Sequence, residues 1–243
     1  MTHYPFPDSR GTKIAFAAFF TAMLFLARDS MFTTAVIGFE KAQFLMLGVI
    51  CLLGAAFLIA NRRNLLKILR DRRMIVAVGS AAVCLLPMLV KRDWQLMYFS
   101  VLLCLLTAVL LSYFLTVREA AKYYVVILSV LGAYSVLAAY ILRIGVDRGA
   151  YAVPVFRNSM GFEFHNFFLS IVPDTYVKNR NFGIFREPGV YQFFLITALY
   201  LNNYEVEWKR PWQLWLVNGI LAATMVSTVV FDLTVAIVIG ITN

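Results

Sequence analysis

Long runs of apolar residues, separated by short polar stretches, cover most of the chain. A helix needs about 20 such residues to cross about 30 Å of hydrocarbon at a rise of about 1.5 Å per residue. We therefore expect seven membrane-spanning helices, at about 12–27, 42–60, 74–90, 94–116, 123–142, 189–201 and 212–230. A final run at 233–241 is too short to span, so either the last helix is one long tilted span or, as we expect, the sequence ends partway through an eighth helix. The pattern predicts an all-α, polytopic transmembrane helical bundle of about 7–8 spans with one long outer-face loop.

The composition agrees with this class. Of the 243 residues, 61% are hydrophobic and 14% are charged, which leaves too little polar surface to cover a soluble domain. The net charge of +9 does not indicate nucleic-acid binding, because basic residues in such a chain gather at membrane edges and meet membrane lipids. The sequence has no zinc-protease, phosphate-loop or dinucleotide-binding motif.

Basic residues between the apolar runs predict the orientation. The stretch 61–73 carries six lysines and arginines against a single acid, Asp71, which places it in the cytoplasm by the positive-inside rule. Counting spans from this loop places the N-terminus in the cytoplasm and the loop 143–188 on the periplasmic or extracellular face. The chain then divides into five N-terminal transmembrane helices (1–142), the outer loop, and further transmembrane helices (189–243).

The outer loop is long for a connection and rich in aromatic residues. Loops of this length are commonly functional unless they are disordered. We expect a folded piece that lies against the membrane, with one amphipathic helix around 161–171. Positive charges on the outer face run against the orientation rule, and binding of an anionic ligand would explain them. The basic residues of the loop are Arg143, Arg148, Arg157, Lys178, Arg180 and Arg186.

The most specific string in the loop is R-N-F-G-I-F-R-E-P-G, residues 180–189. Proline suits the first turn of a helix and an acid suits its N-terminus. One interpretation is therefore that Glu187-Pro188 only starts a helix, with Gly183 and Gly189 as turn and entry residues.

The other interpretation is a binding or catalytic site. Arg180 and Arg186 flank the carboxylate of Glu187 at the mouth of the bundle, on the face where lipid-linked anions lie. Guanidinium groups bind phosphate oxygens in pairs, and a carboxylate between two of them is stabilised in its charged form.

The string R-N-x-G-x-F-x-E-P-G, which closes a long external loop, resembles the O-antigen polymerase and O-antigen ligase superfamily of bacterial inner-membrane proteins. The similarity covers about 94–243 and includes Ser227-Thr228, where family members often carry a Ser/Thr-rich turn. Members are typically longer and have a second external loop with arginines, so the resemblance implies that this sequence is the N-terminal part of such a protein. The implied location is multi-pass, in the bacterial inner (plasma) membrane.

The resemblance implies a glycosyltransferase that polymerises lipid-linked polysaccharide repeat units (O-antigen, capsule or exopolysaccharide) on the outer face. The donor would be a polyprenyl-diphosphate-linked oligosaccharide, without a metal or other cofactor. Arg180 matches the motif and would contact the diphosphate or glycan, whereas Arg186 stands where the motif is variable. Glu187 would be either a general base for the acceptor hydroxyl or an ion-pair partner that fixes the arginines.

Further residues are expected to bind substrate, namely Arg157, Lys178 and His165. The structural positions of the motif would be Gly183, Pro188 and Gly189. A lone histidine in an aromatic loop can equally be structural. Other polysaccharide-assembly proteins, such as a chain-length regulator and a flippase, are possible partners.

Other functions stay open at this point. An O-antigen ligase would transfer the finished glycan to a lipid core. A non-enzymatic transporter or flippase subunit would be expected to show interrupted helices and charges at the membrane midplane, which the sequence lacks. A non-catalytic membrane subunit would agree with the early end of the sequence.

Overall fold

The computed structural model describes residues 10–26, 30, 38–60, 70–91, 102, 105, 107–109, 112–113, 115–157, 161–174, 180–185 and 187–228. The chain divides into two compact units. The first comprises Met1–Ala18 and Phe39–Thr116, and the second comprises Phe19–Gly38 and Val117–Asn243. Helix α1 (Arg10–Leu26) contributes to both units.

The first unit contains α2 (Phe39–Ala60) and α4 (Arg72–Lys91). At the start of α4, the backbone N–H of Arg73 donates to Asp71 Oδ1 at 2.9 Å. The Arg73 guanidinium donates to the Ser112 carbonyl at 2.5 Å and lies 5.2 Å from the ring centroid of Tyr113. This arginine therefore joins the start of α4 to the end of the unit. Most of the expected helix at 94–116 lies outside the described residues.

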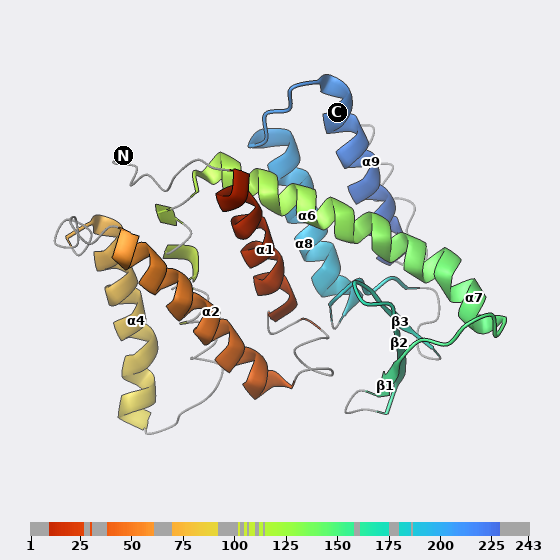
Figure 1. Ribbon diagram of the computed structural model, residues 1–243, viewed down its shortest axis with the longest axis horizontal. Helices are drawn as coiled ribbons and strands as arrows, with labels where there is room; N and C mark the ends of the chain where they lie inside the picture. The colour runs from red at the N-terminus through yellow and green to blue at the C-terminus, as the bar shows by residue number, and fades with distance from the viewer. Residues whose placement is uncertain are drawn as a thin grey trace. The chain divides into compact units, whose positions relative to one another are not determined.

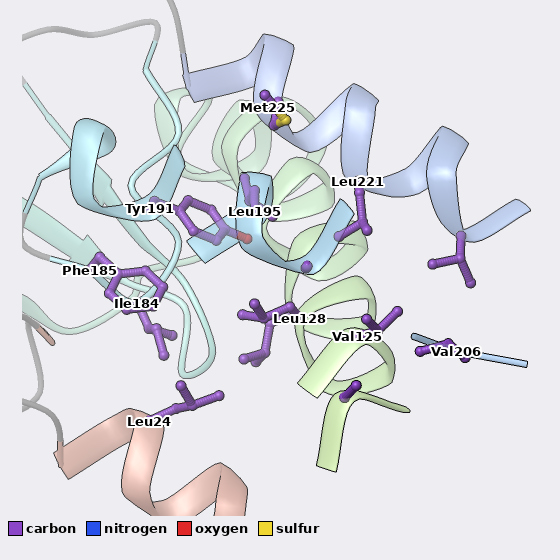
Figure 2. Packing of buried hydrophobic residues seen from close by; sticks show 14 residues of the cluster. Leu24, Val125, Leu128, Ile184, Phe185, Tyr191, Leu195, Val206, Leu221 and Met225 are labelled. Atoms are coloured by element: carbon purple, nitrogen blue, oxygen red, sulfur yellow. The ribbon is translucent and has the colours of Figure 1, made fainter. Parts of the chain in front are cut away.

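Three longer helices form the centre of the second unit: α6 (Val117–Leu137), α8 (Pro188–Tyr204) and α9 (Pro211–Thr228). All three pack on one another, as Figure 1 shows. A π-helical turn, η3 (Ala138–Leu142), and a short helix, α7 (Arg143–Asp147), continue α6 without a break. Apolar side chains from α1, α6, α8, α9 and the motif segment meet in a single core (Figure 2).

The structure corrects the predicted number of spans. Among the described residues, only the continuous helix Val117–Asp147 is long and apolar enough to cross a membrane, and a small sheet accompanies the helices. The polytopic bundle of 7–8 spans is therefore wrong, and a multi-pass arrangement is not supported. Apolar runs also occur in helices that are buried against other helices. Helix α8, with 17 residues, is about 26 Å long and buries Tyr191, Leu195 and Ala198 against its neighbours.

The loop between α7 and α8 contains an antiparallel sheet of three strands, in the order β1-β2-β3. The strands are β1 (Val155–Arg157), β2 (Glu163–Asn166) and β3 (Ile171–Pro173). Phe156 pairs with Phe164, and His165 pairs with Val172.

The amphipathic helix expected around 161–171 is therefore wrong. Along β2, buried Phe164 stands between the half-buried Glu163 and His165, which is the two-residue period of a strand. The β-branched residues Ile171 and Val172 favour a strand as well. The sheet packs beneath the C-terminal end of the long helix, beside η3 and α7 (Figure 1).

Candidate functional site

The motif segment, residues 180–189, forms part of the core of the second unit. From Asn181 to Phe185 every residue is buried. Ile184 and Phe185 point into the helical core, where Figure 2 places them near Leu128 and Tyr191. The Phe182 ring packs on the sheet, with its centroid 5.9 Å from that of Phe164. The segment therefore joins the helices to the sheet.

Asn181 holds the segment to two helices. Its side-chain Nδ2 donates to Ser135 Oγ on α6 at 2.7 Å and to Ser227 Oγ on α9 at 2.9 Å. Its backbone N–H donates to the Ser227 carbonyl at 2.9 Å. Its Oδ1 accepts the N–H of Gly183 at 2.9 Å. Since Asn181 is only 1% exposed, these bonds satisfy an amide that would otherwise be buried at a cost.

Tyr191 of α8 completes this polar network. Its hydroxyl lies 3.1 Å from Ser135 Oγ on α6, and Asn181 links Ser135 to Ser227 on α9, so the network joins three helices. Burial raises the pKa of Tyr191 and outweighs the hydrogen bond from Ser135, which lowers it, so the phenol stays neutral. Gly183 has φ +55° and lies so close to the Tyr191 ring that an added Cβ would stand 2.5 Å from Cε1. Only glycine fits both the backbone conformation and the space.

The residues on either side of this buried stretch are more exposed. Arg180 and Glu187 are both exposed, at either end of the buried stretch. Helix α8 begins at Pro188, with Glu187 as its N-cap in extended conformation, which confirms the predicted helix start. A Cβ added to Gly189 would meet no atom within 4 Å, and its φ is not positive, so nothing in the structure requires glycine there. Arg186 lies outside the described residues.

Two other residues expected to bind substrate, Arg157 and His165, belong to the sheet. Arg157 Nε donates to Glu163 Oε1 at 2.8 Å on the exposed β1–β2 pair. His165 Nε2 lies 3.3 Å from Asp174 Oδ1, and its buried Nδ1 has no hydrogen-bond partner among the described residues. Arg157 thus pairs with an acid of β2, and His165 with the acid that follows β3. The segment and the sheet are nevertheless linked, because the Ile171 N–H donates to the Gly183 carbonyl at 2.7 Å. Lys178 lies outside the described residues.

Sequence reasoning missed two features. Asn181 belongs to the motif, but its hydrogen bonds to Ser135 and Ser227 could not be predicted from the motif sequence. Arg143 is buried, and its guanidinium donates to the Asp174 carbonyl at 3.3 Å and pairs with Asp147 at 3.4 Å. The available signals were serines inside apolar runs and the Arg143/Asp147 spacing of four residues on one helix face.

Within the described part of the chain, no group of three or more His, Cys, Asp and Glu side chains could hold a metal ion. The motif segment instead carries two exposed charged side chains, Arg180 and Glu187, on either side of the buried residues Asn181–Phe185. No family model matches the chain, and neither a curated protein nor a solved structure matches it.

Proposed function

We propose that the chain belongs to a glycosyltransferase of the bacterial plasma membrane that polymerises lipid-linked polysaccharide repeat units. The donor is a polyprenyl-diphosphate-linked oligosaccharide, and the reaction takes place on the outer face. The helix Val117–Asp147, which is long and apolar enough to cross a membrane, is compatible with a lipid-linked substrate.

One observation carries this proposal: Asn181–Phe185 are buried, while Arg180 and Glu187 at either end of the motif segment are exposed. The hydrogen bonds of Asn181 to Ser135 and Ser227 fix the backbone next to Arg180. A charged group that is fixed before the reaction stabilises developing charge without paying for reorganisation.

In the proposed mechanism, the bond between the anomeric carbon and the diphosphate oxygen breaks as the acceptor hydroxyl attacks. Negative charge then develops on the leaving diphosphate. The Arg180 guanidinium donates hydrogen bonds to its oxygens, in the planar geometry that suits phosphate. Glu187 either accepts the proton of the acceptor hydroxyl or fixes the arginines by ion pairing, in which case the proton passes to the leaving diphosphate.

The test is polymerisation of a lipid-linked repeat unit by the full-length gene product in membranes. We expect Arg180→Ala to lower kcat/KM by about 100-fold or more, the scale typical of losing one preorganised donor. Arg180→Lys keeps the charge but loses the paired geometry, so we expect partial recovery. Arg210→Ala, which removes an exposed arginine between α8 and α9, is the matched control and should leave the rate unchanged.

Glu187→Gln keeps the shape of the side chain and removes its charge. We expect loss of polymer with normal membrane insertion.

If Arg180→Ala and Glu187→Ala both still make long polymer, the proposed function is wrong. If the product is glycan on a lipid-core acceptor rather than a longer lipid-linked chain, the enzyme is a ligase.

A further inference from the structure

The turn between β2 and β3 exposes apolar side chains at its end. We call residues 166–170 the hairpin tip. Phe168 is 78% exposed, and Leu169 is also exposed. Phe168 has φ +65° and is the one non-glycine residue with positive φ in the described part of the chain. This conformation costs free energy for a bulky residue, so the turn directs the phenyl ring outward at the expense of backbone strain.

Two hydrogen bonds fix the direction of the hairpin along the long helix. At the tip, the Tyr134 hydroxyl donates to the Phe167 carbonyl at 2.6 Å. At the other end, Arg143 Nη2 donates to the Asp174 carbonyl at 3.3 Å. These helix residues are nine positions apart, which is about 13 Å along the axis. Phe167 and Val172 also pack on apolar side chains of η3 and α7, namely Ala138, Leu142 and Val146.

The position of the tip relative to a membrane follows from the charges on the helix. Lys122 and Arg143 bracket an uncharged stretch of 20 residues, 123–142, whose length of about 30 Å equals the hydrocarbon thickness. Tyr134 lies eight residues before the end of this stretch, so it is about 12 Å inside the hydrocarbon. The tip that contacts Tyr134 is therefore at hydrocarbon depth.

The distribution of charged residues along the hairpin agrees with this placement of the tip. The exposed ion pair of Arg157 and Glu163 lies at the end away from the tip, and Asp174 lies beside Glu163, with its N–H donating to the Glu163 carbonyl at 3.0 Å. By contrast, between Tyr134 and Arg143 the long helix exposes the apolar side chains of Leu137 and Ile141.

We propose that the hairpin tip is a membrane wedge. Phe168 and Leu169 insert into the lipid hydrocarbon at the C-terminal side of the helix Val117–Asp147, while Arg157 and Glu163 stay in water. The occupant of this apolar surface is bilayer lipid. The inference rests on this helix crossing the membrane and does not depend on glycosyl transfer.

The test uses the full chain with Cys51, Cys84 and Cys104 replaced by serine, reconstituted in phosphatidylcholine vesicles. An environment-sensitive fluorophore is attached at Phe168→Cys and, as the control in the same sheet, at Arg157→Cys on β1. We expect a spin label in the lipid acyl chains to quench the first probe and not the second. Aqueous iodide should quench the second and not the first. If iodide quenches both equally and the spin-labelled lipid quenches neither, the wedge is refuted.

A second variant separates insertion from folding. Glycine adopts φ +65° without strain, so Phe168→Gly should unfold in detergent at no lower temperature than the parent protein. With the probe at Leu169→Cys, Phe168→Gly should nevertheless reduce quenching by the spin-labelled lipid. A lower unfolding temperature would show that Phe168 serves internal packing, and unchanged lipid quenching would show that it does not anchor the tip. Either result would overturn the proposal.

Discussion

Asn181 illustrates how one short motif serves both the fold and the proposed chemistry. Its buried amide makes hydrogen bonds to α6, to α9 and to Gly183, while its neighbour Arg180 is exposed. The buried residues Asn181–Phe185 thus determine where the backbone lies, while Arg180 and Glu187 are exposed. Substitution of the buried residues should first lower the free energy of unfolding of the protein. Substitution of Arg180 should lower only the proposed binding and activity.

The two glycines of the motif provide a matched pair of substitutions. Gly183→Ala places a side chain on a residue with φ +55° and 2.5 Å from the Tyr191 ring. We expect it to lower the free energy of unfolding by about 2–4 kcal/mol, combining left-handed strain with overpacking. Gly189→Ala, in the first turn of α8 with open space around it, should be neutral or stabilise by up to about 1 kcal/mol. Thermal or chemical unfolding in detergent measures both.

Equal effects of the two substitutions would contradict the described packing of the motif segment. A stable Gly183→Ala variant in particular would mean that the segment does not approach Tyr191 as closely as described.

Features that depend on a residue and its immediate neighbours in the chain could be predicted from the sequence. Proline at position 188 cannot donate a backbone hydrogen bond, and it begins α8 as expected. The network of Asn181 could not be predicted in this way, because its partners Ser135 and Ser227 each lie 46 positions away in the chain. Such contacts depend on how the helices pack, which no local pattern encodes.

At the scale of elements, small and polar residues determine how the helices of the second unit pack. Gly132 lets α6 approach α9, since a Cβ there would stand 2.6 Å from Thr224 Oγ1. At the other end of the bundle, Asn202 Nδ2 on α8 donates to Asn218 Oδ1 on α9 at 2.8 Å. Asn218 is therefore a polar residue that holds α8 to α9 by a side-chain hydrogen bond.

We expect Gly132→Ala to separate α6 from α9 and to lower the free energy of unfolding by about 1–2 kcal/mol. Thr224→Ala in the same chain removes the overlapping atoms, so the double variant should recover about 1 kcal/mol relative to additivity. Gly219→Ala on α9 has no atom within 4 Å and should not destabilise. Unfolding of the four variants in detergent gives the coupling directly, and strict additivity would contradict the close approach.

The sequence predicted helices at the positions of α6, α8 and α9, yet it misjudged what their apolar residues do. Leu128, Leu195 and Leu221 are fully buried among these helices. Part of the apolar pattern therefore reflects contacts between helices and not contacts with lipid. The sheet was missed because its strands have only three or four residues, too few for their alternation to stand out in an aromatic-rich loop.

For the whole molecule, the second unit brings the features of functional interest together. The helix Val117–Asp147 is long and apolar enough to cross a membrane, and the sheet packs on its C-terminal end. The motif segment contacts the same helix at Ser135 and the same sheet at Phe164. The buried neighbours of Arg180 are therefore fixed to both the helix and the sheet.

The central claim is that Arg180 binds the diphosphate of a carrier lipid, and the most direct measurement is the affinity of the full chain for a polyprenyl diphosphate in lipid nanodiscs. Losing a hydrogen bond to a charged group costs about 1.5–3 kcal/mol, so Arg180→Ala should raise Kd by about 10- to 100-fold. Arg210→Ala should leave Kd unchanged. If Arg180→Ala binds the lipid diphosphate as tightly as the unaltered chain, the claim is contradicted.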